Sequence, residues 1–108
     1  MKPNQSLNEL SSRIFIAIDA ILVDFAPDIV LVHGDTTTSS ITAWAAFHRG
    51  IKVGHVEAGL RTFDKFSPFP EEINRQITGK IADYHFAPTE LSKENLLAEK
   101  VADNTILI

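Results

Sequence analysis

The sequence predicts an α/β fold in which helices flank a parallel sheet. Segments with apolar residues every three to four positions alternate with short, continuous runs of β-branched residues and leucine. Capping residues, glycines and prolines stand at the boundaries between these segments. The alternation of helix and strand is typical of right-handed βαβ crossovers. In a chain of 108 residues, this pattern indicates one Rossmann-like half.

The first half of the chain predicts a helix followed by a strand, a helix and a strand. Ser6 and Glu9 match a capping box, and apolar residues at helical spacing then predict a helix that ends near Pro27. The continuous apolar run that follows is typical of a strand covered on both faces. The expected elements are a strand over residues 29–32, a helix over 37–49 stopped by Gly50, and a strand over 53–56.

A long loop separates this half from the remaining elements. It runs from Glu57 to Phe69, and a loop of this length inside a compact domain is usually functional. Pro70 suits the first turn of a helix, and the two glutamates after it favour the positive end of the helix dipole. The elements expected next are a helix over residues 70–82, a strand over 84–87, a helix capped by Thr89 and reaching about Lys100, and a strand over 105–108.

Composition narrows the class of protein. The net charge of −4, the pI of about 5.4 and the lack of a basic run argue against a nucleic-acid partner. The chain has no cysteine, so disulfides and thiolate metal sites are excluded. No apolar run reaches the roughly 18 residues of a membrane span, and the opening has no signal core. We expect a soluble cytoplasmic protein without a membrane partner.

Two predicted strands end in a histidine and a carboxylate. His33 and Asp35 follow the first strand, and His55 and Glu57 close the second. Ligands of parallel α/β sheets bind just beyond the carboxyl ends of the strands. The pattern therefore predicts an active-site rim at this edge.

Spacing alone leaves other interpretations of these residues open. Asp35 also suits the N-cap of the helix that follows it. Glu71 would serve equally well as a helix-dipole charge paired with Arg75 four positions later. The two His-x-acid pairs, together with His85, would also fit the dinuclear metal site of a phosphoesterase. Such pairs arise easily by chance, however, and we expect no metal.

Four sequence blocks carry a resemblance to a known family. The blocks HGDTTT, VGHVEAGLR, SPFPEEINRQITGKIADYHFAPT and NLLAE closely resemble the non-hydrolysing UDP-N-acetylglucosamine 2-epimerases. The resemblance runs from about Gln5 to Ile108, and members of the family look like two Rossmann-type domains facing a cleft, a GT-B-like fold. It implies that residues 1–108 are a partial N-terminal domain. The first strand-loop and the C-terminal UDP-binding domain are absent from this sequence.

The resemblance also implies a reaction. Family members interconvert UDP-N-acetylglucosamine and UDP-N-acetylmannosamine by inversion at C2, through elimination and re-addition of UDP. No cofactor is needed, and the expected enzyme is a homodimer in cell-envelope polysaccharide biosynthesis. The 108 residues alone are expected to be inactive, and a nucleotide-sugar-binding or oligomerisation module is the alternative. The residues implied are Asp35, Glu57 and Glu71 for catalysis, Arg75, Arg61, His33 and Thr36 for substrate binding, and Gln5 for regulation.

Overall fold

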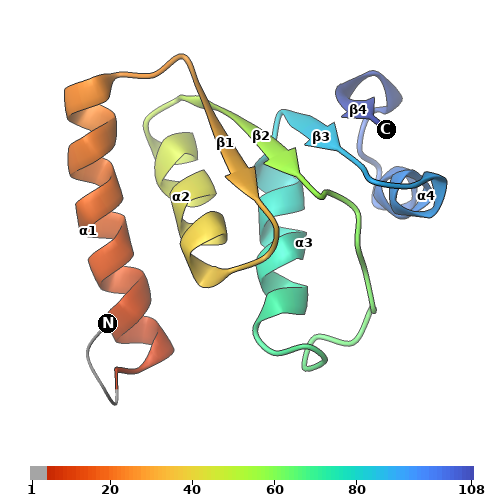
Figure 1. The fold of residues 1–108 in the computed structure, drawn as a ribbon, viewed down its shortest axis with the longest axis horizontal. Coiled ribbons are helices and arrows are strands. Elements are labelled where there is room, and N and C mark those ends of the chain that lie inside the picture. Colours follow the sequence, from red (N-terminus) through yellow and green to blue (C-terminus); the bar gives the residue numbers. More distant parts are fainter. Residues whose placement is uncertain (1–4) are drawn as a thin grey trace.

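A computed structural model describes residues 5–108 and contains one four-stranded sheet with helices (Figure 1). No helix in this described part is both long enough and apolar enough to cross a membrane. The elements in chain order are α1 (Leu7–Phe25), β1 (Ile29–His33), α2 (Thr37–His48), β2 (Lys52–Val56), α3 (Glu71–Ile81), β3 (Tyr84–Phe86), α4 (Glu90–Ala98), the 3-10 turn η1 (Asp103–Thr105) and β4 (Ile106–Leu107).

The sheet is parallel and has the strand order β1-β2-β3-β4, which confirms the predicted Rossmann-like α/β class. The order advances in one direction, so crossovers of the same hand bring the connecting helices to one face. Figure 1 shows α2 and α3 behind the strands, and α1 beside α2. The register pairs His33 with Val56, so β1 and β2 end side by side. The fold thereby brings the two predicted strand-end motifs to a common edge.

Two small cores join the helices to this covered face. The first lies between α1, α2 and the strands, where Val32 and Val53 pack with Leu22 and the alanines of α2. The second lies under α4, where Leu96 packs against Ala58 and Ile106. Ala58 directly follows Glu57, the first residue after β2, so the second core holds the start of the long loop.

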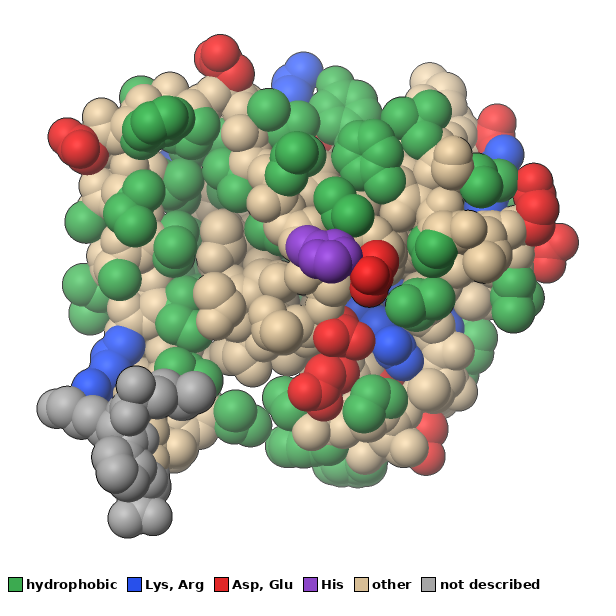
Figure 2. Space-filling view, viewed as in Figure 1, with side chains coloured by type: hydrophobic (Ala, Val, Ile, Leu, Met, Phe, Trp, Pro, Cys, Tyr) green, Lys and Arg blue, Asp and Glu red, His purple; other side chains and the backbone are tan. Residues whose placement is uncertain are grey.

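The prediction that residues 29–32 form a strand covered on both faces is wrong for the described part of the chain. Val32 is buried, but Leu31 is 62% exposed and Ile29 is 42% exposed. All connecting helices lie on the other face, which leaves these side chains uncovered. Figure 2 shows this open face, with hydrophobic side chains over its upper part and a histidine among charged side chains near its centre. The large exposed hydrophobic residues of the open face are Ile29, Leu31, Tyr84 and Leu107.

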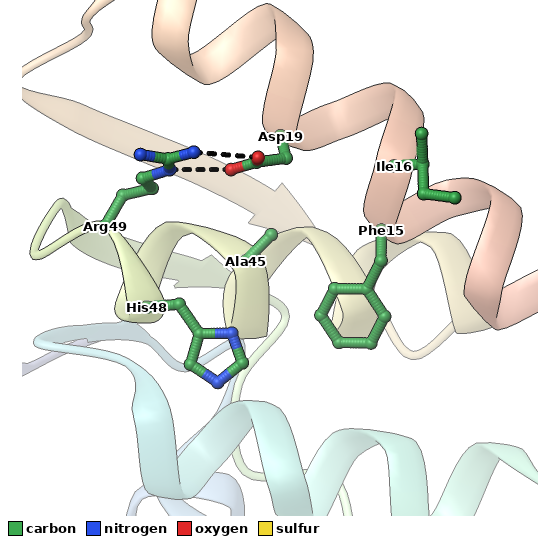
Figure 3. Close-up of a pocket in the computed structure, with 6 residues that line it drawn as sticks. All are labelled: Phe15, Ile16, Asp19, Ala45, His48 and Arg49. Carbon is green, nitrogen blue, oxygen red and sulfur yellow. Dashed lines mark hydrogen bonds and ion pairs between the residues drawn. The ribbon is translucent and has the colours of Figure 1, made fainter.

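The contact between α1 and α2 combines an ion pair with aromatic packing (Figure 3). Arg49 donates from Nε and Nη2 to the two carboxylate oxygens of Asp19, at 2.7 and 2.8 Å. Phe15 stacks on His48 with ring centroids 6.1 Å apart. These residues line a cavity of about 470 Å³ between α1 and the C-terminal end of α2. The contact aligns α1 with α2 and has no part in the strand-end motifs.

The helix caps follow the sequence closely. The Ser6 hydroxyl accepts from the Glu9 amide at 3.0 Å, as predicted. The Glu9 carboxylate, however, accepts from the Ser6 hydroxyl rather than from a backbone amide. The Thr89 hydroxyl caps α4 as predicted. That helix ends at Ala98 instead of Lys100, because Lys100 has a positive φ of 67° that stops helical bonding.

Candidate active site at the carboxyl ends of β1 and β2

The ends of β1 and β2 are joined by side-chain and backbone hydrogen bonds. His33 Nε2 lies 2.9 Å from Glu57 Oε1. The Gly34 amide donates to the Val56 carbonyl at 3.0 Å. The buried ring of His55 reaches across to the Gly34 carbonyl, with Nε2 at 2.8 Å from the oxygen. The predicted meeting of the two strand-end motifs at one edge is therefore confirmed.

Asp35 is not the N-cap of α2, so that alternative is wrong. The cap is Thr36, whose hydroxyl accepts from the Ser39 amide at 3.1 Å. A threonine in an extended conformation one residue later supplies the oxygen that the helix end needs. The Asp35 carboxylate instead lies 3.4 Å from Nη1 of Arg75 and is 32% exposed. It is held by a cation and remains open to a ligand.

Arg75 stands between two carboxylates. Its Nη2 is 2.6 Å from Glu72 Oε1 and its Nη1 is the group that meets Asp35. The alternative pairing with Glu71 at i+4 does not form, because Arg75 turns toward the residue three positions earlier. The Glu71 side chain is partly exposed and takes part in none of the side-chain hydrogen bonds or ion pairs found in residues 5–108. Its carboxylate is therefore unengaged beside the Arg75 network.

Glu72 is a central residue that the sequence reasoning missed. Its side chain is fully buried and accepts from the Thr62 and Phe63 amides at 3.1 and 3.0 Å. It also accepts from the Gln76 amide and from Arg75. Burial favours the neutral acid, but these donors outweigh it and lower the pKa of the Glu72 carboxyl from 4.5 to about 2. Glu72 is therefore ionised at neutral pH and ties the long loop to α3.

Asn74 is a second residue that the sequence reasoning missed. Its side-chain amide donates to the Asp35 carbonyl at 3.1 Å and to the Thr37 hydroxyl at 3.3 Å. It therefore joins α3 to the segment between β1 and α2. The i, i+3 spacing of Glu72 and Arg75 is a sequence signal that could have predicted their ion pair. No local sequence pattern indicates that Asn74 bonds the segment after β1.

Arg61 pairs with a carboxylate that is not one of the predicted catalytic residues. Its side chain is fully buried and its Nε and Nη2 donate to the two oxygens of Glu99 at 2.8 and 2.9 Å. A third nitrogen donates to the Leu60 carbonyl. Within the described residues it makes no hydrogen bond or ion pair with the predicted catalytic residues. Its expected contact with a diphosphate stays a prediction, and the observed contacts tie the loop to α4.

His55 and His85 are buried neighbours on β2 and β3. In both rings Nδ1 has no hydrogen-bond partner within the described part of the chain. Burial lowers both pKa values, that of His85 to about 4, so both rings are neutral at pH 7. The described residues contain no group of three or more His, Asp or Glu side chains that could hold a metal ion. The dinuclear-metal alternative therefore gains no support.

Gln5 lies just before α1 and is partly buried. Among residues 5–108 its buried side-chain nitrogen finds no hydrogen-bond partner. No hydrogen bond or ion pair in the described part of the chain links it to the strand-end residues. Its regulatory role stays a prediction.

Replacing Glu72 by glutamine should lower the free energy of unfolding by about 3 to 5 kcal/mol, because it leaves the buried Arg75 without its closest anion. The folded-state pKa lies below the ordinary value, so this stabilisation is present above about pH 4.5 and disappears as the pH falls toward 2. Thermal melts from pH 7 to pH 2.5 should show an acid-dependent loss in the wild type that is smaller in Glu72→Gln.

Glu71→Gln is the matched control, because it removes a neighbouring carboxylate that has no bond. It should leave the melting temperature and its pH dependence close to those of the wild type. Equal melts for Glu72→Gln and Glu71→Gln would contradict the assignment of Glu72.

Comparison with known proteins places this arrangement in a family. The model of the UDP-N-acetylglucosamine 2-epimerase family matches residues 1–108. The curated UDP-N-acetylglucosamine 2-epimerase of Escherichia coli K12 is 58% identical over the whole chain, and that of Bacillus subtilis is 56% identical. The chain spans 29% and 28% of the length of these two relatives.

Solved structures agree in fold. The crystal structure of UDP-GlcNAc 2-epimerase from Neisseria meningitidis bound to UDP-GlcNAc matches with a TM-score of 0.97 and 52% identity. The match includes all of this chain and 29% of the Neisseria protein chain. The Methanocaldococcus jannaschii enzyme in complex with UDP-GlcNAc and UDP matches with a TM-score of 0.92 and 45% identity over 95% of this chain and 28% of that protein. The chain therefore belongs to the UDP-N-acetylglucosamine 2-epimerase family.

Proposed function

We propose that this chain carries the catalytic carboxylates of an enzyme that interconverts UDP-N-acetylglucosamine and UDP-N-acetylmannosamine. The observation that carries the proposal is the placement of Asp35 and Glu57 at adjacent strand ends, with Arg75 against Asp35. Family membership, and the UDP-GlcNAc bound by the Neisseria relative, support this substrate class. Neither the binding-module nor the phosphoesterase alternative gains support from the comparisons.

The proposed reaction needs proton transfer and a stabilised leaving group. A carboxylate removes the proton at C2 while UDP leaves C1, which forms 2-acetamidoglucal. UDP then adds back to C1 and a proton returns to C2 from the other side. Asp35, Glu57 and Glu71 are the groups proposed for the proton steps. Arg75 is proposed to contact the diphosphate, because a guanidinium matches phosphate oxygens.

His33 and Thr36 are proposed to contribute to substrate binding in different ways. His33 is 68% exposed and touches Glu57, so its ring can meet a ligand while it orients that carboxylate. Thr36 uses its hydroxyl to cap α2. The amides at the start of α2 are therefore ordered beside Asp35, where a helix N-terminus favours an anion.

We propose further that the 108 residues are part of the N-terminal half of a longer two-domain, GT-B-like protein. The chain spans 29% of the length of its relatives, and its sheet has an apolar open face. β1 also lies at the sheet edge, where its outer backbone groups are available to another strand. The first strand-loop and the UDP-binding domain would supply the rest of the cleft.

A homodimer is proposed for the full-length protein. Ile16 is 71% exposed on α1, and Phe25 and Phe47 are exposed on α1 and α2. Large exposed apolar side chains on neighbouring helices are typical of a surface that binds another protein chain. The cytoplasmic location expected from the sequence stays a prediction.

The 108 residues alone should show no epimerase turnover, because only one wall of the cleft is present. The measurement is proton NMR of the sugar after incubation of the chain with UDP-N-acetylglucosamine. The full-length protein is the positive control. Turnover by the short chain near the full-length rate would refute the proposed division of the site.

Asp35→Asn in the full-length protein should lower kcat by about 100-fold to 10,000-fold, because a positioned acid or base is lost. UDP binding by calorimetry should change much less, and circular dichroism should show an intact fold, because Thr36 rather than Asp35 caps α2. Asp28→Asn, at an exposed position before β1, is the matched control and should keep full activity. A folded Asp35→Asn protein with wild-type turnover would show that Asp35 is not catalytic.

Ile16→Glu should convert the full-length homodimer to a monomer, because it places a charge in the proposed apolar contact. Sedimentation equilibrium measures the mass directly. Leu91→Glu, at a similarly exposed leucine of α4, is the control and should leave the dimer intact. A wild-type monomer, or a dimer unaffected by Ile16→Glu, would rule out this interface.

A further inference from the structure

Glu57 has a backbone conformation that its own side chain does not favour. Its φ is 66°, in the left-handed region, and it is not glycine. Such a conformation persists only where the surrounding structure fixes it, and it occurs often at functional sites. The contacts that hold residues 57–61 therefore determine where the Glu57 carboxylate stands.

One side of this segment is held by the sheet. His33 contacts the Glu57 carboxylate, and the Ala58 amide donates to the Phe86 carbonyl at 3.0 Å. Ala58 is fully buried in the core under α4. These contacts fix the residue after Glu57 but leave the turn beyond it to other elements.

The other side is held by Ser92 and Asn95 of α4 and by Glu99, the C-cap of that helix. Gly59 packs so closely on the Ser92 backbone that a Cβ at Gly59 would collide with it. The Asn95 side-chain amide donates to the Gly59 carbonyl at 3.0 Å. One turn later, Glu99 accepts both hydrogen bonds of the buried Arg61 fork. Ser92, Asn95 and Glu99 share one face of the helix, since they are three and four residues apart.

The Arg61 guanidinium is enclosed from the α3 side as well. A Cβ at Gly79 of α3 would lie 2.9 Å from Arg61 Nη2, so glycine makes room for the fork. A bidentate pair enclosed in this way has one geometry. It fixes the end of the 57–61 segment, just as Ala58 fixes its beginning.

We infer that Asn95 of α4 and Glu99, the C-cap of that helix, are positioning residues that hold the Glu57 carboxylate in place for catalysis, Glu99 acting through Arg61. The inference deepens the proposed epimerase function and rests on it. Asn95 and Glu99 form no hydrogen bond or ion pair with Asp35, Glu57 or Glu71 in residues 5–108. Asn95 acts through the Gly59 carbonyl and Glu99 through the Arg61 side chain. Displacement of a reacting group by about 1 Å can cost about 100-fold in rate. A loss of these contacts should therefore reduce kcat more than it changes KM.

The test uses the full-length protein with Asn95→Ala and Glu99→Gln, and Glu94→Gln as the matched control. Glu94 is an exposed residue of the same helix, and its side chain takes part in none of the side-chain hydrogen bonds or ion pairs found in residues 5–108. For each folded variant, kcat, KM and the isotope effect on kcat with substrate deuterated at C2 are measured. The ring NMR signals of His33 report the position of Glu57 independently of turnover.

Both variants should lower kcat by about 10-fold or more with KM within about threefold. The isotope effect should differ from the wild-type value, whereas a smaller folded fraction would leave it unchanged. The His33 signals should shift, and Glu94→Gln should match the wild type in every measurement.

Wild-type kcat, isotope effect and His33 signals in folded Asn95→Ala would overturn the inference, even if Glu99→Gln does not fold. A higher KM at unchanged kcat in Glu99→Gln would also overturn it, in favour of direct substrate binding by Arg61. If the wild-type protein has no epimerase activity, the proposed function fails, and unchanged His33 signals would then separately refute the positioning role.

Discussion

The site depends on the ion-pair chain from Glu72 through Arg75 to Asp35. Glu72 is buried and holds two loop amides, while its oxygen orients Arg75. Arg75 in turn meets Asp35 beyond the end of β1. A buried ion pair returns little net stability, because desolvation offsets the attraction. The effect of this network is instead to fix positions, because its hydrogen bonds and ion pairs hold the loop, α3 and the end of β1 in one arrangement.

A second ion pair, between the buried Arg61 and the partly exposed Glu99, is proposed to play the corresponding part for Glu57. The Arg61 and Glu99 fork closes the loop against α4, whereas the Glu72 network closes it against α3. The loop is thus anchored at neighbouring positions, at residue 61 and at residues 62 and 63, while its exposed phenylalanines remain at the surface. The described cores are small and consist mainly of alanine, valine and leucine. Hydrogen bonds and ion pairs therefore fix the parts of the loop that apolar packing does not hold.

The sequence predicted what depends on local pattern. Periodicity located each helix and strand, and parallel strands implied that Asp35 and Glu57 would lie at one edge of the sheet. Prediction failed where one helical step changes the outcome. Glu71 and Glu72 are adjacent, but about 100° of rotation leaves one partly exposed and buries the other. The open side of Leu31 was also missed, because an apolar run does not say which of its faces the described chain covers.

The central claim is that the carboxylate rim at the ends of β1 and β2 surrounds the reacting carbon of a UDP-N-acetylhexosamine. A crystal structure of the full-length protein with this substrate tests it most directly. The account predicts C2 of the sugar within about 3.5 Å of an oxygen of Asp35, Glu57 or Glu71. It also predicts the diphosphate beside Arg75. A sugar bound away from these strand ends, with the three carboxylates in water, would contradict the account.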